Sequence, residues 1–167
     1  MHEPIETDEL DAGEFPREGD NREKLRFAVR WAVRAPSSHN SQPWCFRLGD
    51  DHVDVIADRA RALPVVDPED RELVMSCGAA LHHLRVAMAC FGMAPEVTVF
   101  PEADDADSLA RVRIGEPREP TDEERRMLDA IPKRRTNRGP FAEEPVPADV
   151  LDDLERAARE EGAWLVS

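Results

Sequence analysis

Apolar and polar positions alternate along the chain in blocks whose spacing changes from helical to strand-like. Between residue 21 and Pro36 the apolar residues recur every three or four positions, which predicts a helix that ends before the proline. Residues 45–49 and 51–57 are two short strand-like segments separated by glycine and aspartate, which predicts a hairpin. The apolar face of the helix predicted before Pro36 consists of Leu25, Ala28, Val29, Ala32 and Val33.

The longest apolar segment lies in the middle of the chain, at residues 73–93 (LVMSCGAALHHLRVAMACFGM). It is apolar on nearly every side, so we expect a central helix that is buried on several faces. Asp67 is the predicted N-cap, with Pro68 at the first helical position, and Gly92 is predicted to end the helix. This helix is the expected core of the domain.

The second half of the chain continues with strands and then helices. Strands are expected at 96–100 and 109–115. Thr121 and Glu124 form the pattern of a capping box, which predicts a helix through Ile131. A loop then leads to an amphipathic helix over residues 148–162, and residues 163–167 (AWLVS) are typical of the start of a strand.

Composition limits the partners and the compartment of the protein. With 36 acidic and 22 basic residues the formal net charge is −14, which disfavours general binding to nucleic acid or to anionic lipid. The first twenty residues are acidic and have no period, so a flexible or loosely docked arm is expected over 1–20. No apolar run is expected to span a membrane, and the acidic N-terminus does not resemble a signal peptide. Three scattered cysteines, Cys45, Cys77 and Cys90, suit small buried side chains in a reducing cytoplasm.

A basic cluster stands out against this acidic background. In residues 133–138 (KRRTNR) four of six side chains are basic. Guanidinium groups suit a phosphate, and Gly139 with Pro140 allows the backbone to turn around one, so the cluster is a candidate phosphate site. The alternative is a solvated loop whose arginines pair with nearby acids. Nucleic-acid binding is less favoured, because no aromatic residues interleave with the basic ones and no second basic patch exists.

A second motif, APSSHNSQPW at residues 35–44, is dense in groups that donate and accept hydrogen bonds. Its position directly after a helix leaves backbone N–H groups available for the polar edge of a heterocycle, and Trp44 is a candidate to pack beside that ring. A plain helix stop followed by a serine-rich turn explains any single residue here, but explains the whole decapeptide less well. The candidate ligand-binding side chains are Ser37, Ser38, Asn40 and Gln42.

Together these segments resemble the FMN-dependent nitroreductase family. The family carries an A-P-S-x-x-N-x-Q-P-W/F loop, an R-R-S-x-R-x-F phosphate motif and a long central helix, and residues 35–44, 134–141 and 76–93 are similar to these in turn. Here the arginine motif comes last, has Thr136 in place of serine, and has one extra residue before Phe141. That order resembles the double-length, Acg-type branch, in which two nitroreductase-like units are fused. Residues 21–119 would then be the first unit, and residues 120–167 the start of a second.

The resemblance implies an α+β fold, with an antiparallel or mixed sheet flanked by helices around a long buried central helix. It implies that FMN is the cofactor, with Arg134, Arg135 and Arg138 on the phosphate and Thr136 assisting. It also implies that Ser37, Ser38, Asn40 and Gln42 orient the ribityl chain and the ring. No side chain is assigned as a catalytic acid or base, and no metal is expected.

The implied activity is hydride transfer from NAD(P)H through the flavin to a small-molecule acceptor, a nitro compound or a quinone. The protein would act as a homodimer, or as a pseudo-dimer whose second repeat is incomplete here. Two alternatives stay open at this point: a flavin-binding or sequestering protein without significant turnover, and an FMN-free remnant that serves as an interaction module.

The interior of the central helix contains two further features of note. His82 and His83 point about 100° apart on a helix, so one is expected to be buried and hydrogen-bonded and the other to lie at the surface. Gly78 is costly in a helix unless something packs closely against it, either another helix or the isoalloxazine ring, and helix packing is the expected reason. Residues 64–72 (PVVDPEDRE) are interpreted as a helix start without chemistry.

Overall fold

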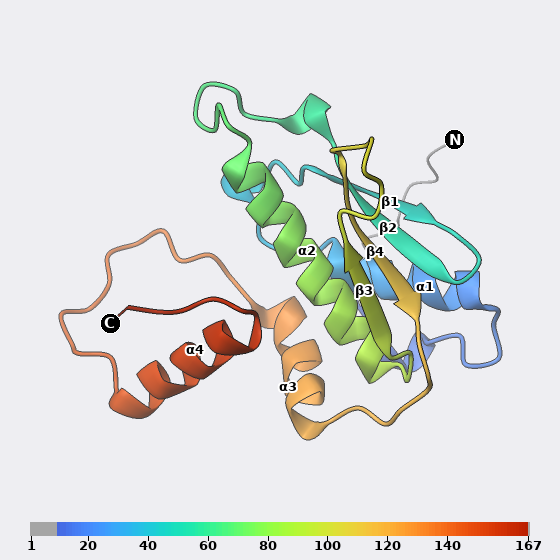
Figure 1. The fold of residues 1–167 in the computed structure, drawn as a ribbon. Helices are drawn as coiled ribbons and strands as arrows, with labels where there is room; N and C mark the ends of the chain where they lie inside the picture. Colours follow the sequence, from blue (N-terminus) through green and yellow to red (C-terminus); the bar gives the residue numbers. More distant parts are fainter. Residues whose placement is uncertain (1–9, 167) are drawn as a thin grey trace. The chain divides into compact units, whose positions relative to one another are not determined.

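Two compact units, divided between Thr136 and Asn137, make up the computed structural model, which describes residues 10–166. Figure 1 shows the course of the chain. The larger unit contains a sheet and three α-helices among its described residues, in the order α1 (Asn21–Ala32), β1 (Trp44–Leu48), β2 (His52–Ala57), α2 (Arg71–Cys90), β3 (Pro95–Val99), β4 (Ser108–Ile114) and α3 (Asp122–Ala130). The smaller unit contains α4 (Ala148–Glu160).

The sheet has the strand order β1-β2-β4-β3, and each neighbouring pair is antiparallel. The expected hairpin is confirmed, since Trp44 pairs with Ala57 and Leu48 with Val53. The expected α+β class is confirmed as well, in its antiparallel form. Because side chains alternate between faces along a strand, residues aligned by this register share a face of the sheet. One face is apolar, and α1 and α2 pack against it.

The core lies between this apolar face and the two helices. Val53, Val55 and Val112 of the sheet meet Leu25 and Val29 of α1 there, and all are fully or almost fully buried. α2 adds the buried side chains Leu73, Cys77, Ala80, Leu84, Val86, Ala87 and Met88. Burial of apolar side chains stabilises the fold by roughly 1.5–3 kcal/mol for each large residue. The expected central helix is confirmed (Figure 1).

The opposite face of the sheet is polar and is organised around one buried carboxylate. Asp54 is 1% exposed, and the Arg111 guanidinium donates to both of its oxygens, at 2.6 Å and 3.0 Å. Burial alone would raise the pKa of Asp54, but the hydrogen bonds and the charge of Arg111 outweigh it and lower that pKa. Asp54 is therefore held as a carboxylate.

The helix α1 begins at a capping box that the sequence interpretation did not name. The Asp20 carboxylate accepts from the Glu23 backbone N–H at 2.8 Å, and the Glu23 carboxylate accepts from the Asp20 N–H at 2.9 Å. The helix that follows ends at Ala32, so its prediction before Pro36 is confirmed.

The start of α2 differs from the prediction. The helix begins at Arg71, and its N-cap is Asp70, not Asp67, so Pro68 lies before the helix. Asp70 has a left-handed backbone (φ 55°) and makes no side-chain cap bond. Asp67 still serves the first turn from a distance, because its carboxylate accepts the Leu73 backbone N–H at 2.9 Å. The predicted end is confirmed by Gly92, whose φ of 79° is left-handed.

α2 is also long and apolar enough to cross a membrane by length and composition alone, contrary to the expectation that no segment would be. Half of its most apolar window is buried inside the fold, however, against α1 and the sheet. That is the pattern of the core helix of a globular domain.

The N-terminal segment was predicted to be a flexible or loosely docked arm over residues 1–20, and residues 1–9 lie outside the described part. Within residues 10–20, Leu10 and Phe15 pack against the core. The ring of Phe15 stacks on that of Phe91 with centroids 4.6 Å apart, so this part of the segment is anchored.

The last two helices follow their predicted patterns. Thr121 and Glu124 form the expected capping box, with bonds of 2.8 Å and 3.1 Å, and α3 adds Leu128 to the core. α3 belongs to the larger compact unit, and the start of a second repeat at residue 120 stays a prediction. α4 agrees with its prediction, but residues 163–166 form no strand, contrary to expectation.

Candidate functional site

The decapeptide at residues 35–44 adopts a backbone that is unusual for its sequence. His39, Asn40 and Gln42 have φ values of 51°, 58° and 49°, in the left-handed region where non-glycine residues are uncommon. A left-handed residue other than glycine costs about 1–2 kcal/mol, and such strain gathers at functional sites. This loop is therefore shaped by more than the need to end a helix.

Contacts from distant parts of the larger unit hold the loop in this shape. The Ser37 hydroxyl accepts the Gln42 backbone N–H at 2.9 Å. The Arg61 guanidinium donates to the carbonyls of Ser41 and Gln42 at 3.4 Å and 3.5 Å. The thiol of Cys77 donates to the Pro43 carbonyl at 3.1 Å, which ties the loop to the middle of α2.

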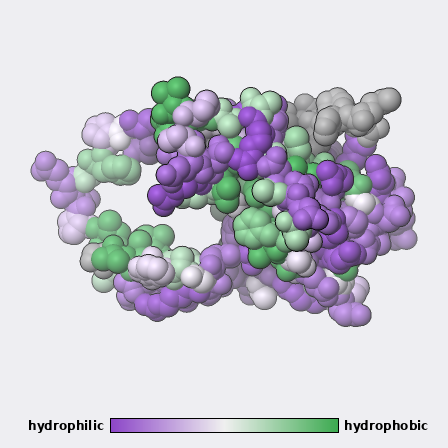
Figure 2. Space-filling view, turned by 45° about the horizontal axis from the view of Figure 1, so that its top comes forward, coloured by the Kyte–Doolittle hydropathy of each residue, from purple (hydrophilic) through white to green (hydrophobic). Residues whose placement is uncertain are grey.

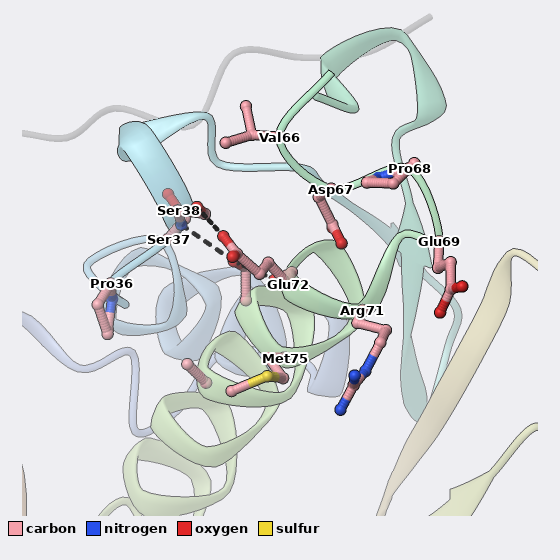
Figure 3. A pocket seen from close by; sticks show the side chains of 12 residues that line it. Pro36, Ser37, Ser38, Val66, Asp67, Pro68, Glu69, Arg71, Glu72 and Met75 are labelled. Atoms are coloured by element: carbon pink, nitrogen blue, oxygen red, sulfur yellow. Dashed lines mark hydrogen bonds between the residues drawn. The ribbon is translucent and has the colours of Figure 1, made fainter. Parts of the chain in front are cut away.

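A pocket of about 800 Å³ lies between this loop and the first turns of α2 (Figure 3). Ligand pockets commonly have volumes of about 300–1,000 Å³. Ser37 and Ser38 line one side, and another side is lined by Val66, Asp67, Pro68, Glu69 and Arg71. The α2 side consists of Glu72, Met75, Ser76 and Ala79.

Ser38 is fixed to α2 from both its backbone and its side chain. Its hydroxyl donates to the Glu72 carboxylate, and Figure 3 shows these two side chains pointing toward one another. Its backbone N–H donates to the Ser76 hydroxyl at 3.2 Å, and that hydroxyl donates to the Glu72 carbonyl at 2.7 Å. The loop and the start of α2 therefore form one hydrogen-bonded wall.

The sequence interpretation missed the α2 side of this pocket and gave no chemistry to residues 64–72. The signal was present, because Glu72, Met75, Ser76 and Ala79 lie at spacings of three and four and share one helix face. Because the helix was predicted to be apolar on nearly every side, this partly polar face was not singled out.

The same face of α2 is open to solvent beyond the pocket. Met75 is 71% exposed, and a Cβ placed on Gly78 would meet nothing within 4 Å. The expected reason for Gly78, close helix packing, is therefore wrong within this fold. Exposed apolar side chains stand out from the mostly hydrophilic surface in Figure 2, and on α2 and its preceding loop they are Val65, Val66, Val74 and Met75.

The remaining members of the decapeptide differ in their positions. Asn40 is exposed and Gln42 is half-buried, and the Gln42 amide lies 3.5 Å from the Asn40 side-chain oxygen. Trp44, expected to be a candidate to pack beside a bound ring, is instead buried in the core from β1. Neither Asn40 nor Gln42 lines the pocket of Ser37 and Ser38.

The arginine loop leaves α3 through a short 3₁₀ turn, and its side chains are exposed. Arg134 donates to the Thr136 hydroxyl at 3.2 Å, and Arg135 donates to the carbonyls of Pro132 and Arg134 at 2.8 Å each. Within residues 10–136, these bonds of the two guanidinium groups go to a hydroxyl and to carbonyls, and the alternative of a solvated loop stays open. Arg138 lies in the smaller unit.

Arg134 lines a second, smaller pocket of about 190 Å³ between α2 and α3. His82 and His83 face it from α2, and its apolar lining is Val86, Met127, Ala130 and Ile131. His83 is 8% exposed, whereas His82 is half-buried. Burial first, and then the charges of His82 and Arg134, lower the pKa of His83 to about 4, although a hydrogen bond with the Trp31 backbone opposes the shift.

The two predicted motifs therefore line separate pockets that follow one another along α2. Met75 and Ala79 belong to the first pocket, and His82 and Val86 to the second. From Met75 to Val86 the helix rises by about 16 Å. An elongated ligand with a flat ring and an anionic end fits such a surface, because Gly78 leaves the helix flat at its middle and Arg134 lies at one end.

Comparison with known proteins gives several relatives that are named as nitroreductases. No protein-family model matches the chain. Over 138 residues, 82% of the chain, it is 39% identical to "Putative NAD(P)H nitroreductase Rv3131" of Mycobacterium tuberculosis (strain H37Rv), of which it covers 40%. Over 121 residues, 72% of the chain, it is 43% identical to "Putative NAD(P)H nitroreductase acg" of the same organism, of which it covers 37%. Over 66 residues, 36% of the chain, it is 41% identical to "Probable NAD(P)H nitroreductase PigM" of a Serratia strain, of which it covers 17%. The chain thus spans about two fifths of the length of the first two relatives.

Proposed function

Because this chain belongs to the nitroreductase family, in the branch that includes Acg, we propose that it forms part of an FMN-dependent NAD(P)H oxidoreductase. The observation that carries this proposal is the surface of α2, which joins the serine loop at one end to Arg134 at the other. The acceptor is a small molecule, a nitro compound or a quinone, and the compartment is the cytoplasm.

The residues present fit FMN by their chemistry. The guanidinium groups of Arg134 and Arg135, with the Thr136 hydroxyl, hold the phosphate, and guanidinium suits phosphate oxygens through paired hydrogen bonds. At the other end, the hydroxyl of Ser37 already accepts from Gln42, which leaves its own O–H to donate to the ligand.

Ser38 complements Ser37 at the ring end. Its hydroxyl donates to Glu72, so its oxygen is oriented to accept from the ligand. The amides of Asn40 and Gln42 supply both donors and acceptors toward the ribityl chain and the ring edge. The exposed backbone at Gly78 lets a flat ring approach α2 closely.

The bound flavin supplies the redox chemistry, by accepting a hydride from NAD(P)H and passing electrons to the acceptor. The protein binds and orients the ring and keeps its face accessible. Glu72 lies at the ring end of the surface, where its carboxylate fixes Ser38. We assign no side chain to proton transfer.

The exposed face of α2 supports the proposal that the full site needs a second unit. Met75 and Val74 are apolar and exposed beside the pocket, which is typical of a surface that a partner covers. We propose that a second nitroreductase-like unit, in a longer chain or in a second copy, covers this face as a homodimer or pseudo-dimer.

The test is turnover by the chain loaded with FMN. Oxidation of NADH or NADPH in the presence of a quinone is followed at 340 nm, with riboflavin as the control ligand that lacks the phosphate. The proposal predicts oxidation that saturates with the quinone. FMN binding without NAD(P)H oxidation would instead support the second candidate, a flavin-binding protein without turnover.

A further inference from the structure

Asp67 is a buried carboxylate in the wall of the pocket beside the serine loop, and one of its oxygens has no partner. The side chain comes from the segment before α2 and is 7% exposed. Its Oδ2 accepts the Leu73 backbone N–H at 2.9 Å, whereas Oδ1 has no hydrogen-bond or ion-pair partner among the described residues. Oδ1 is also not one of the unpartnered side-chain atoms that the fold encloses completely. It is therefore accessible to an occupant of the pocket.

Figure 3 shows how Asp67 lies in this pocket. Its carboxylate points toward the first turn of α2, and Ser37 and Ser38 lie on the other side of the pocket. Arg71 lines the same pocket but makes no ion pair with Asp67, and its guanidinium points away from that carboxylate. Within residues 10–166, no positively charged side chain pairs with Asp67.

The charges of the lining indicate what the free oxygen binds. A carboxylate oxygen accepts hydrogen bonds and donates none, and burying a carboxylate is costly unless a donor or a cation pairs with it. Glu69 and Glu72 add two further carboxylates, against the single guanidinium of Arg71. A cationic donor therefore fits this lining better than an anion. The described residues form no group of three or more side chains that could hold a metal ion, so an organic cation is favoured.

The apolar part of the lining indicates the rest of the ligand. Val66, Met75 and Ala79 give the pocket apolar surface, and Met75 is 71% exposed. A volume of about 800 Å³ lies within the range of pockets that bind molecules with ring systems. An ammonium group has three N–H donors and no acceptor, which suits Oδ1 of Asp67. The ligand that fits both parts is an apolar ring with an amine.

We propose that this pocket binds a protonated amine attached to an apolar ring, with the ammonium group donating to Oδ1 of Asp67 and the ring against Met75. In the oxidoreductase proposed above, this ligand is the electron acceptor, a nitro compound or a quinone that carries an amine. That assignment rests on the proposed function. The amine takes no part in the electron transfer, and it positions the acceptor in the pocket.

The experiment titrates the FMN-free chain with three ligands that differ at one substituent. At pH 7, 4-nitrobenzylamine is a cation, 4-nitrobenzyl alcohol is neutral and 4-nitrobenzoate is an anion. Affinities are measured at equal ionic strength from amide NMR shifts, which include that of Leu73, the partner of Asp67. We expect the amine to bind at least ten times more tightly than the alcohol, and the benzoate to bind no more tightly than the alcohol. Equal affinities for amine and alcohol, or no binding of the amine, overturn the inference.

Variants then assign the selectivity to Asp67. Asp67→Asn keeps an oxygen that accepts from Leu73 but removes the charge, so the ratio of amine to alcohol affinity should fall close to one. Asp104→Asn removes the same charge from an exposed residue that does not line the pocket, and it should keep the ratio of the unaltered chain. A ratio that persists in Asp67→Asn would refute the role of this carboxylate.

Turnover by the FMN-loaded chain separates this inference from the proposed function. We expect kcat/KM for 4-nitrobenzylamine to be at least ten times that for 4-nitrobenzyl alcohol, with the difference in KM. Turnover with equal kcat/KM values leaves the proposed function standing and overturns the acceptor assignment. Amine-selective binding without NAD(P)H oxidation removes the proposed function and supports the amine site. Riboflavin binding that Asp67→Asn weakens tenfold, with equal affinities for amine and alcohol, gives Asp67 to the flavin ring and overturns the inference.

Discussion

Acidification is expected to destabilise the larger unit through His83, a residue in the middle of its central helix. Burial and the neighbouring charges lower the pKa of His83 to about 4, from 6.5 in an unfolded chain. Above pH 6.5 the ring is neutral in both the folded and the unfolded chain, so its titration does not lower the free energy of unfolding there. As the pH falls from 6.5 toward 4, the unfolded chain binds a proton that the folded chain does not, and stability is lost.

The size of the effect follows from the shift. One pKa unit corresponds to about 1.4 kcal/mol, so the loss of unfolding free energy is about 2 kcal/mol at pH 5 and about 3 kcal/mol at pH 4. Urea denaturation followed by circular dichroism at pH 7 and pH 5 measures it. The His83→Asn variant, whose side chain cannot titrate, should lose about 2 kcal/mol less unfolding free energy than the unaltered chain between pH 7 and pH 5.

A matched substitution separates this effect from general acid sensitivity. His39 is exposed in the serine loop, and asparagine tolerates its left-handed backbone well. His39→Asn should therefore keep the full pH dependence. The reasoning is refuted if His83→Asn and His39→Asn have the same dependence between pH 7 and pH 5.

Three further predictions concern the sheet, the helix surface and the thiols. Arg111→Met should lower the unfolding free energy by about 3–5 kcal/mol, because it removes the guanidinium that bonds both oxygens of the buried Asp54 carboxylate and leaves only Arg47 and His52, at 3.8 Å and 4.0 Å, among the described residues near it; urea denaturation measures this, and a loss below 1 kcal/mol would contradict it. Gly78→Ala should raise the unfolding free energy by about 1 kcal/mol while weakening FMN binding, since its methyl group meets no neighbour but lies where the ring is proposed to pack; unchanged FMN affinity would exclude that placement. Burial raises the pKa of Cys77 to about 12 and that of Cys90 to about 11, and it also raises that of Cys45, so a thiol reagent at pH 8 should modify all three only after unfolding; rapid modification of the folded chain would show that a thiol is accessible and ionised.

The fold was largely accessible from the sequence because its elements carry local signals. The period of α1, the turn before β2 and the capping box of Thr121 and Glu124 each depend on neighbouring residues, and each prediction is confirmed. The predicted start of α2 was wrong because it depends on a longer-range contact: Asp67 accepts the Leu73 N–H from outside the helix, while the backbone turn that begins the helix lies at Asp70. A strand at residues 163–166 was expected from composition, but a strand needs a pairing partner, and the described residues supply none.

The candidate site was accessible only in part. Ser37, Ser38 and Arg134 were named from their chemistry, and each lines a pocket. The involvement of Glu72 depends on how the loop folds back onto α2, which no local pattern encodes. Whether the two pockets bind one ligand stays a prediction, as do the roles of the other motif residues, Asn40, Gln42, Arg135, Thr136 and Arg138.

We propose that one FMN molecule contacts both the serine loop and the arginine loop. Its most direct test is an FMN titration, followed by flavin fluorescence, of the unaltered chain, of Ser37→Ala/Ser38→Ala, of Arg134→Ala/Arg135→Ala and of the combined variant. We expect saturable binding that each pair of substitutions weakens at least tenfold, and riboflavin binding that depends on the serines alone. FMN affinity that is the same in all four proteins would contradict it.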